Sequence, residues 1–374
     1  MAETTVEWTG TATQRDTALD ALRGFIVVVM ALDHANFFIT EEHSSEHWFE
    51  MPRYDSALPF VTRLVTHPAA PGFFFLMGVG MMLFANSRRA RGWTEGRIIR
   101  HFLSRGAVLI ALQFTIVNLA WQTGPGTNPT LYLGVLAALG GGMILASLAL
   151  QLPVWALTLA ATALFVGMEL THPDAANWEE LFQQPLGLVF GYSGGSDFFW
   201  SNYPVLPWLE LVLLGMVFGK LLITNRDRAY RIALALGAAF LVGFTVMRAA
   251  NGFGNVVDRQ DGWIGFFNVV KYPPAMTFTL LTMGVNLILL GAFGRIRGRG
   301  RAALTPLALF GSVPLFFYVT HLYLYSLIGA IEPGTSSYPT MCLLWLVGLA
   351  ILYPACAWYA GVKRRHPDSL LRFI

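Results

Sequence analysis

One hydrophobic segment near the start of the chain carries an arginine and a histidine whose spacing could serve chemistry inside a membrane. His34 follows Arg23 by eleven residues in TALDALRGFIVVVMALDHANFF. Eleven residues make about three helical turns, so both side chains lie on nearly the same face, about 16 Å apart along the axis. Ionisable groups within an apolar span usually mark a functional site. An imidazole is the usual general base near neutral pH, and a guanidinium binds phosphate groups.

The composition places these residues in a membrane protein. Of 374 residues, 55% are hydrophobic and 13% are charged, and the mean hydropathy is +0.53. A soluble domain carries about 25% charged residues. The sequence therefore predicts an all-α, polytopic integral membrane protein. It contains neither a basic, aromatic-rich polar domain nor a Cys/His spacing typical of metal sites, so we expect no nucleic-acid partner and no metal.

Apolar runs of about 20 residues predict ten transmembrane helices. Arg and Lys follow the second, sixth, eighth and tenth runs, whereas the opposite loops are acidic or neutral, so both termini are expected in the cytoplasm. This predicts a cytoplasmic segment at 1–17, a transmembrane domain at 18–361 and a cytoplasmic tail at 362–374. The loops at 171–203 and 249–273 are expected to fold over the outer face as lids. The predicted helices are 18–39, 59–85, 99–120, 131–151, 153–170, 204–223, 230–248, 274–294, 304–331 and 340–361.

Depth within these helices places several polar residues in one outer slab of the membrane. By helical rise, the slab contains the three histidines His34, His67 and His321, together with Asp33 and Glu210. Adjacent residues on a helix diverge by about 100°, so Asp33 is poorly directed at the ring of His34. We expect Asp33 to orient His67 or His321 from a facing helix. A structural alternative is that each polar group only satisfies another buried group.

The inner third of the membrane carries a different set of polar residues. Asp20 and Arg23 lie there with Arg100 and Arg105, where the cations suit an anionic cosubstrate arriving from the cytoplasm. The alternative is that Arg100 and Arg105 only extend to the inner interface. The arginines of the loops are explained by topology alone.

Several motifs resemble known membrane acyltransferases. The Arg23-x10-His34 arrangement, which begins in LDALRG, resembles the signature of the acyltransferase-3 family, which O-acetylates cell-envelope sugars. Other segments are more similar to the heparan-α-glucosaminide N-acetyltransferase-like family, also called DUF1624. These segments are THPAAPGFFFLMG at 66–78, YPVLPW at 203–208, KYPP at 271–274 and VPLFFYVTH at 313–321.

The resemblance implies a CoA-dependent transmembrane acyltransferase with a core of ten helices. Acetyl-CoA would be the cosubstrate from the cytoplasm, and the acetyl group would pass to a hydroxyl or amine of a carbohydrate or other acceptor on the far side. The Arg and His of the acyltransferase-3 signature are functionally required, which implies the same for Arg23 and His34. The expected site residues are Asp20, Arg23, Arg100, Arg105 and Lys271 for cosubstrate binding, and Asp33, His34, His67 and His321 for catalysis.

Some alternatives stay open at this stage. The base is His34, His67 or a histidine of the first outer loop, His47 or His43, and transfer is either direct or through an acyl-histidine. The rival functions are a proton-coupled transporter or flippase of a sugar or lipid, and a non-catalytic assembly protein. We expect the protein in the lipid bilayer of a bacterial cytoplasmic (inner) membrane, and a homodimer is compatible with the sequence.

Overall fold

The computed structural model describes residues 16–41, 46–124, 129–331 and 336–366, and it confirms an all-α membrane protein. Within these ranges, eight helical segments are long and apolar enough to cross a membrane. A ninth is present if α7 (Val154–Leu170) and its bent continuation at 175–181 form one span. The eight are α1 (Thr17–Thr40), α2–α3 (Ala57–Arg89), α4–α5 (Glu95–Gln122), α10 (Val205–Thr224), α11 (Arg226–Ala250), α13 (Met276–Arg295), α16 (Pro314–Ile331) and α17 (Tyr338–Arg365).

The predicted span at 131–151 departs most from a membrane helix. It begins with strand β1 (Leu131–Leu133), and its helix α6 (Val135–Ser147) has only 13 residues, fewer than the roughly 20 that a span needs. Side-chain amides hold the strand in place. Gln113 donates to the carbonyl of Tyr132 at 3.2 Å, and the backbone N–H of Tyr132 donates to Asn118 at 3.0 Å. These amides satisfy backbone groups that a helix would have satisfied internally.

Two other predicted spans are interrupted before a proline. His67-Pro68 separates α2 (Ala57–Thr66) from α3 (Ala69–Arg89), and Val313 separates α15 (Thr305–Ser312) from α16. Proline lacks an N–H and disfavours the helical conformation of the preceding residue. In the first break, Asn286 of α13 donates to the carbonyl of Pro68 at 2.9 Å. The break leaves His67 at the end of a helix.

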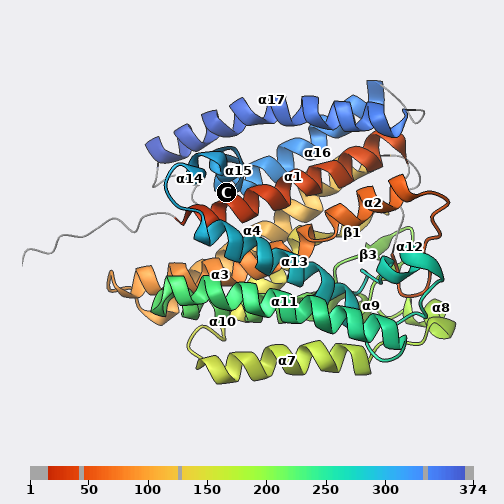
Figure 1. Ribbon diagram of the computed structural model, residues 1–374, viewed down its shortest axis with the longest axis horizontal. Coiled ribbons are helices and arrows are strands. Elements are labelled where there is room, and N and C mark those ends of the chain that lie inside the picture. The colour runs from red at the N-terminus through yellow and green to blue at the C-terminus, as the bar shows by residue number, and fades with distance from the viewer. Residues whose placement is uncertain (1–15, 42–45, 125–128, 332–335, 367–374) are drawn as a thin grey trace, which may run out of the picture.

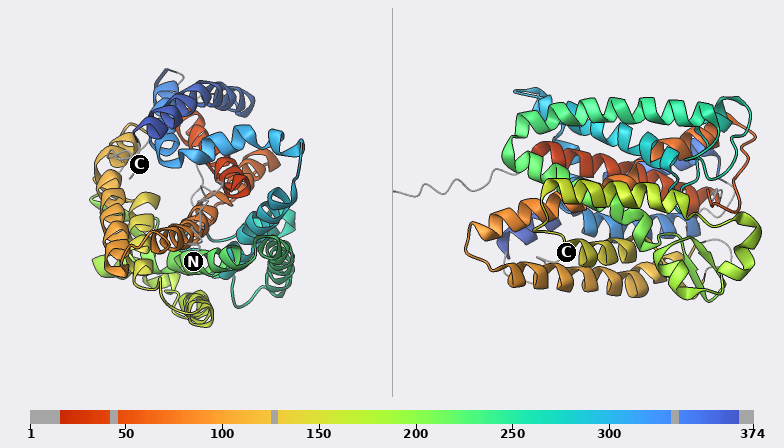
Figure 2. Two further views of the ribbon diagram at one scale, coloured as in Figure 1. Left: turned by 90° about the vertical axis from the view of Figure 1, so that its left-hand side faces the viewer. Right: turned by 90° about the horizontal axis from the view of Figure 1, so that it is seen from below.

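Helix α1 lies in the middle of the bundle (Figures 1 and 2). It packs against α3, α13, α15, α16 and α17. Around it, α10 packs against α3, α6 and α7, α11 packs against α13, and α4 (Glu95–Leu112) packs against α6. The polar side chains of α1 are therefore surrounded mainly by protein rather than by lipid.

The contact between α1 and α15 is a backbone contact made through two glycines. A Cβ at Gly24 would overlap the backbone carbonyl of Leu307, and a Cβ at Gly311 would overlap that of Asp20. Small residues allow this approach between membrane helices. The contact fixes the rotation of α1 beside Arg23.

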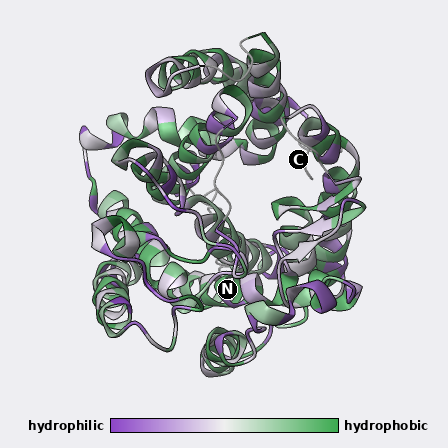
Figure 3. Cartoon of the chain, turned by 90° about the vertical axis from the view of Figure 1, so that its right-hand side faces the viewer, coloured by the Kyte–Doolittle hydropathy of each residue, from purple (hydrophilic) through white to green (hydrophobic). Residues whose placement is uncertain are grey.

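The two ends of the bundle differ in character. We call the end that carries the arginine-rich connections the basic end, where Arg226 pairs with Asp16 at 3.0 Å and Arg297 with Asp227 at 2.6 Å. The opposite, loop end lies on the right of Figure 1 and faces the viewer in Figure 3, which shows hydrophobic residues along most of the helical ribbon.

Short elements cover the loop end where the sequence predicts lids. The connection at 171–203 contains a 3-10 turn (Ala175–Asn177), α8 (Trp178–Leu181), α9 (Pro185–Phe190), β2 (Gly194–Gly195) and β3 (Phe199–Ser201). Strand β3 pairs in parallel with β1 and antiparallel with β2. The later connection contains α12 (Gly262–Phe267), and the small α14 (Gly300–Ala303) lies near the basic end. The loop end is thus built from segments that are distant in sequence.

Candidate active site

Two predicted residues from distant helices meet in a hydrogen bond. His34 of α1 and His321 of α16 are joined Nδ1 to Nε2 at 2.7 Å, and Nδ1 of His321 lies 2.9 Å from the carbonyl of Phe317. A carbonyl oxygen only accepts, so the neutral ring of His321 carries its proton on Nδ1, and its Nε2 accepts from His34. This assignment leaves the lone pair of a neutral His34 on Nε2. The second histidine therefore selects the tautomer of the first.

Aromatic rings surround His34. Its ring meets that of Trp121 edge-to-face at 5.1 Å and that of Tyr318 at 6.5 Å. Among the described residues, the buried indole Nε1 of Trp121 has no hydrogen-bond partner. A buried indole N–H usually finds one, so this donor stands out.

A π-helical segment positions this tryptophan. Residues Gln113–Val117 form the π-helix, and the short helix α5 (Asn118–Gln122) follows it and carries Trp121. Such widened turns often occur at functional sites. The hydroxyl of Tyr323 on α16 donates to the carbonyl of Ile116 at 2.6 Å, which joins the segment to the helix of His321.

A buried ionic network lies beside the histidine pair. Arg63 of α2 donates to Asp33 at 2.5 Å and to both oxygens of Glu46 at 2.6 and 2.5 Å, and Thr66 donates to Asp33 at 3.1 Å. Arg63 is 4% exposed and Glu46 is fully buried. Asp33 is thus held by Arg63 and Thr66, and the partners of His67 and His321 are other groups. This differs from the predicted role of Asp33 in orienting either histidine.

The remaining outer histidines occupy separate positions. Nε2 of His67 lies 3.2 Å from Glu46, and Nδ1 of His67 has no hydrogen-bond partner among the described residues. His47 is bonded to the hydroxyl of Ser193 at 3.2 Å, and its ring contacts Tyr272. The other candidate of that loop, His43, lies outside the described residues.

Glu46 remains ionised in this environment. Burial acts to raise the pKa of its carboxyl group, but the nearby Arg63 and His67 lower it well below its ordinary value. The carbonyl of Glu46 also accepts the backbone N–H groups of Lys271 and Tyr272, both at 3.0 Å. The network therefore joins the first outer connection to the segment before α13.

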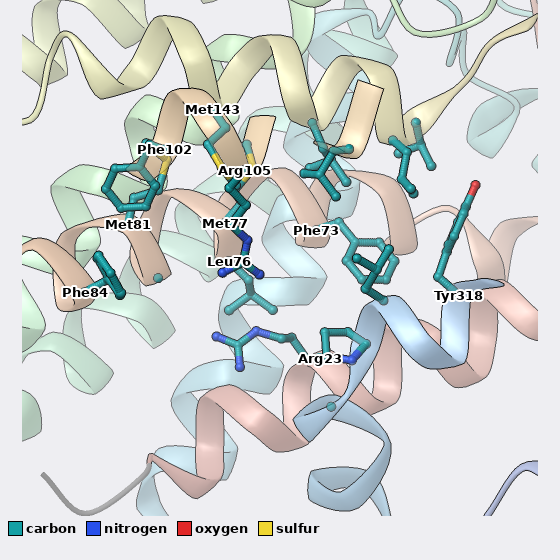
Figure 4. A pocket seen from close by; sticks show the side chains of 18 of the residues that line it. Arg23, Phe73, Leu76, Met77, Met81, Phe84, Phe102, Arg105, Met143 and Tyr318 are labelled. Atoms are coloured by element: carbon teal, nitrogen blue, oxygen red, sulfur yellow. The ribbon is translucent and has the colours of Figure 1, made fainter. Parts of the chain in front are cut away.

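A cavity of about 340 Å³ lies between α1, α3, α4, α6 and α16. By helical rise along α3, it extends about 16 Å from Phe84 near the basic end to Phe73 in the middle of the bundle. Arg23 and Arg105 reach into it from opposite walls, and Tyr318 closes the far end (Figure 4). Its other lining residues are mainly Leu, Met and Phe, and Lys363 of α17 joins the two arginines.

Only some of the residues predicted to bind the cosubstrate line the cavity. Arg23 and Arg105 line it, and Asp20 pairs with Arg23 at 2.6 Å. Arg100 is exposed and is not part of the lining. Lys271 lies at the loop end, where its ammonium group is 4.9 Å from the ring of Tyr272. The structure therefore places Arg23 and Arg105 together, and Arg100 and Lys271 apart from them.

Several residues of the site were not predicted. Arg63 is a charged residue within the apolar run 59–85, and the rule applied to His34 and Arg23 would have identified it. Tyr318 and Trp121 carry no comparable signal, because aromatic residues are common in any membrane helix. In the described part of the chain, no group of three or more His, Cys, Asp or Glu side chains could hold a metal ion.

Comparison with known proteins identifies the family of the chain. The family model described as "Heparan-alpha-glucosaminide N-acetyltransferase, catalytic" matches residues 15–247, more than half of the chain, and includes His34, Arg63 and Arg105. A search of curated proteins finds no match. The predicted family resemblance is confirmed, although the motifs at 271–274 and 313–321 lie beyond the matched segment. The chain therefore belongs to the heparan-α-glucosaminide N-acetyltransferase catalytic family of membrane-bound acetyltransferases.

Proposed function

We propose that the protein transfers an acetyl group from acetyl-CoA at the basic end to an amine or hydroxyl of a carbohydrate acceptor at the loop end. One observation carries this proposal: the cavity holds Arg23 and Arg105 between Phe84 at its basic end and Tyr318 at its far end (Figure 4), and the ring of Tyr318 lies 6.5 Å from that of His34. A donor can therefore enter from one side of the membrane and meet a base near the other. The positive-inside rule supports a cytoplasmic basic end and an extracytoplasmic loop end, here in a bacterial inner membrane.

The cavity suits an elongated donor with an anionic head. Arg23, Arg105 and Lys363 would bind the phosphate groups, since guanidinium groups bind phosphate in bidentate fashion. The apolar wall of α3 would then contact the pantetheine arm and direct the thioester toward Tyr318. A volume of about 340 Å³ falls within the range of about 300–1,000 Å³ that is common for ligand pockets.

The histidine pair supports direct transfer. Nε2 of His34 takes the proton from the acceptor as its nitrogen or oxygen attacks the thioester carbon, and the bond to the CoA sulfur breaks to release a thiolate. The indole N–H of Trp121, which has no hydrogen-bond partner among the described residues, is suited to donate to the carbonyl oxygen as its charge grows. His321 keeps His34 in the required tautomer. Direct transfer predicts sequential kinetics, and ping-pong kinetics would instead indicate an acyl-enzyme.

Calorimetric titration of acetyl-CoA into the detergent-solubilised protein tests the donor site. We expect saturable binding that Arg23→Ala weakens by about tenfold or more, because a hydrogen bond to a charged group contributes about 1.5–3 kcal/mol. Arg100→Ala is the matched control, since this arginine is exposed and does not line the cavity, and its affinity should equal that of the wild type. A folded wild type that binds no acetyl-CoA would contradict the proposal and favour a transporter.

A further inference from the structure

A carboxyl group that the proposed mechanism does not use lies within a membrane-spanning helix. Glu210 is 5% exposed, and by helical rise it lies about 8 Å from the start of α10 at the loop end. Among the described residues, the only hydrogen bond to its carboxyl group comes from the hydroxyl of Thr279 on α13, which donates to Oε1 at 3.3 Å. Ionisable side chains within a membrane usually pair with other groups and mark functional sites. Oε2 of Glu210 therefore remains available to a ligand.

Glu210 lines a slot between α7 and α11. The slot has a volume of about 90 Å³ and shares no lining residue with the donor cavity. Helix α10 lies beneath it, since both α7 and α11 pack against α10, and α13 supplies Thr279 to the same slot. The other lining residues are Thr162 and a set of Ala, Leu and Phe side chains. In the part of the chain that the structure describes, this lining contains no Lys, Arg or His, so the slot offers Glu210 no cation.

Helix α7 is fastened near both of its ends. At the loop end, the carboxylate of Glu169 in its last turn accepts the backbone N–H of Met276 at the start of α13, at 3.1 Å. Toward the basic end, Lys220 of α10 donates to the carbonyl of Leu152, which precedes α7. Between these two contacts, α7 packs against α10. The gap between α7 and α11 is therefore part of the fold.

The slot opens toward the lipid. Helix α7 lies at the edge of the bundle (Figures 1 and 2), and Thr162, which lines the slot, is exposed on that helix. Large apolar side chains are exposed on both flanking helices, among them Leu159 of α7 and Val242 of α11. An extended apolar surface of this kind contacts the acyl chains of a membrane. A ligand therefore reaches Glu210 from the bilayer.

The size and polarity of the slot favour a ligand with a small, neutral head. The volume is several times the roughly 10–15 Å³ that one water molecule needs, but well below the roughly 300 Å³ of a typical ligand pocket. A glycerophosphate headgroup is larger and would place a phosphate charge beside Glu210 without a cation. A hydroxyl group both donates and accepts hydrogen bonds, so it pairs with a carboxyl group in either protonation state. Phe165 and Phe240 provide apolar walls for the aliphatic chain that follows the hydroxyl group.

We propose that the slot between α7 and α11 binds the hydroxyl group of a single-chain lipid alcohol from the bilayer, at Oε2 of Glu210. The chain of the alcohol extends past Phe165 and Phe240 into the surrounding lipid. Thr279 holds the carboxyl group in place through its hydrogen bond to Oε1. The site is separate from the donor cavity, so the inference does not depend on the proposed function.

Photo-crosslinking tests the slot in the full-length protein in detergent. The probe is decanol with a diazirine in the middle of its chain, which releases nitrogen gas on illumination and leaves a carbene that inserts into a neighbouring bond. We expect adducts on the segments of α7 and α11 that line the slot, at 161–165 and at Phe240. An excess of unmodified decanol should lower these adducts about tenfold. Decane and decyl phosphate should not compete, because the first lacks a hydroxyl group and the second carries a charge.

Variants of the slot separate recognition of the hydroxyl group from a folding defect. Glu210→Leu should lower the adducts on α7 and α11 about tenfold, because the hydroxyl group loses its partner. Glu210→Gln keeps a donor and an acceptor and should retain most of the crosslinking. Thr162→Phe fills the slot and should also remove the adducts, whereas Ala163→Phe, at an exposed position outside the lining, should behave as the wild type does.

Three results would overturn the proposal. The first is a wild type without adducts on the slot segments. The second is equal competition by decane and decanol, which would show that the slot does not recognise the hydroxyl group. The third is an equal loss of adducts in Glu210→Gln and Glu210→Leu, which would indicate an ammonium group in place of the alcohol. A wild type that binds the alcohol but not acetyl-CoA would contradict the proposed function alone.

Discussion

Nδ1 of His34 lies 2.7 Å from Nε2 of His321, although the two residues are 287 positions apart in the chain. The carbonyl of Phe317 fixes the proton of the second ring, so the pair has a defined direction from His34 to His321 to the backbone of α16. A neutral histidine in this tautomer presents Nε2 as a base. The arrangement assigns different roles to two histidines that the sequence presents as equivalent.

The two roles predict different mutant kinetics. His34→Ala should lower kcat by about 10²–10⁴-fold, the usual contribution of a general base, with acetyl-CoA binding intact. His321→Leu removes the acceptor for Nδ1 and should lower kcat at least about tenfold, because the wrong tautomer becomes accessible. His321→Gln retains an acceptor oxygen and should recover much of the loss. Single-turnover transfer rates measure all three, and a wild-type rate for His34→Ala would remove it from the site.

The indole N–H of Trp121 predicts a loss confined to the chemical step. Trp121→Phe keeps an aromatic ring but removes the donor, and kcat should fall by about 10²-fold, as when one oxyanion donor is lost. Trp208→Phe is the matched control, because its buried Nε1 also lacks a partner in the described structure but does not contact His34. Equal rates for the two variants would exclude the donor role of Trp121.

Gly80 offers a way to obstruct the donor cavity without disturbing the fold. It lines the cavity, and within the described structure a Cβ added there meets no atom within 4 Å apart from its chain neighbours and the backbone of its own helix. Gly80→Leu should weaken acetyl-CoA binding by more than about tenfold. The unfolding temperature should stay level or rise, because leucine favours a helix by up to about 1 kcal/mol over glycine. Gly96→Leu, equally unobstructed but outside the cavity, should bind as the wild type does, and similar affinities for both variants would place the donor elsewhere.

Removal of Arg63 should destabilise the protein strongly. Arg63→Met leaves Asp33 and Glu46 without their buried cation, and breaking a buried ion pair costs about 3–5 kcal/mol. The unfolding midpoint in a fixed detergent would measure the loss. A triple variant that adds Asp33→Asn and Glu46→Gln removes the uncompensated charges and should regain part of the stability. Unchanged stability of Arg63→Met would show that the network is not structural.

The ionisation of Glu46 predicts a dependence of stability on pH. Because Arg63 and His67 hold the pKa of this carboxyl well below its ordinary value despite burial, the folded state favours the ionised form. Its contribution is complete above the unfolded-state value of about 4.3 and falls by about 1.4 kcal/mol per pH unit below it, until the folded-state pKa is reached. The advantage of the wild type over Glu46→Gln should therefore be largest at neutral pH and shrink below about pH 4. Glu179→Gln, at an exposed position, is the control variant with which the pH dependence of Glu46→Gln stability is compared.

Helix interruptions illustrate where prediction from sequence ends. The apolar run 59–85 does form one long segment, but the turn at His67-Pro68 divides it and places the histidine against Glu46. Hydropathy measures the transfer of a segment into lipid and is insensitive to such a break. The apolar character of residues 131–151 likewise gives no sign of strand β1, which depends on the side-chain amides of Gln113 and Asn118.

The sequence by itself determined the membrane class, the places of nearly all the long helices and the family, because apolar length and local motifs are properties of contiguous residues. It also indicated His34 and Arg23 as residues too costly to lie in lipid without a role. Tertiary structure alone decided which polar groups meet. The pairing of His34 with His321, and of Asp33 with Arg63, depends on the rotation and contact of helices that hydropathy does not specify.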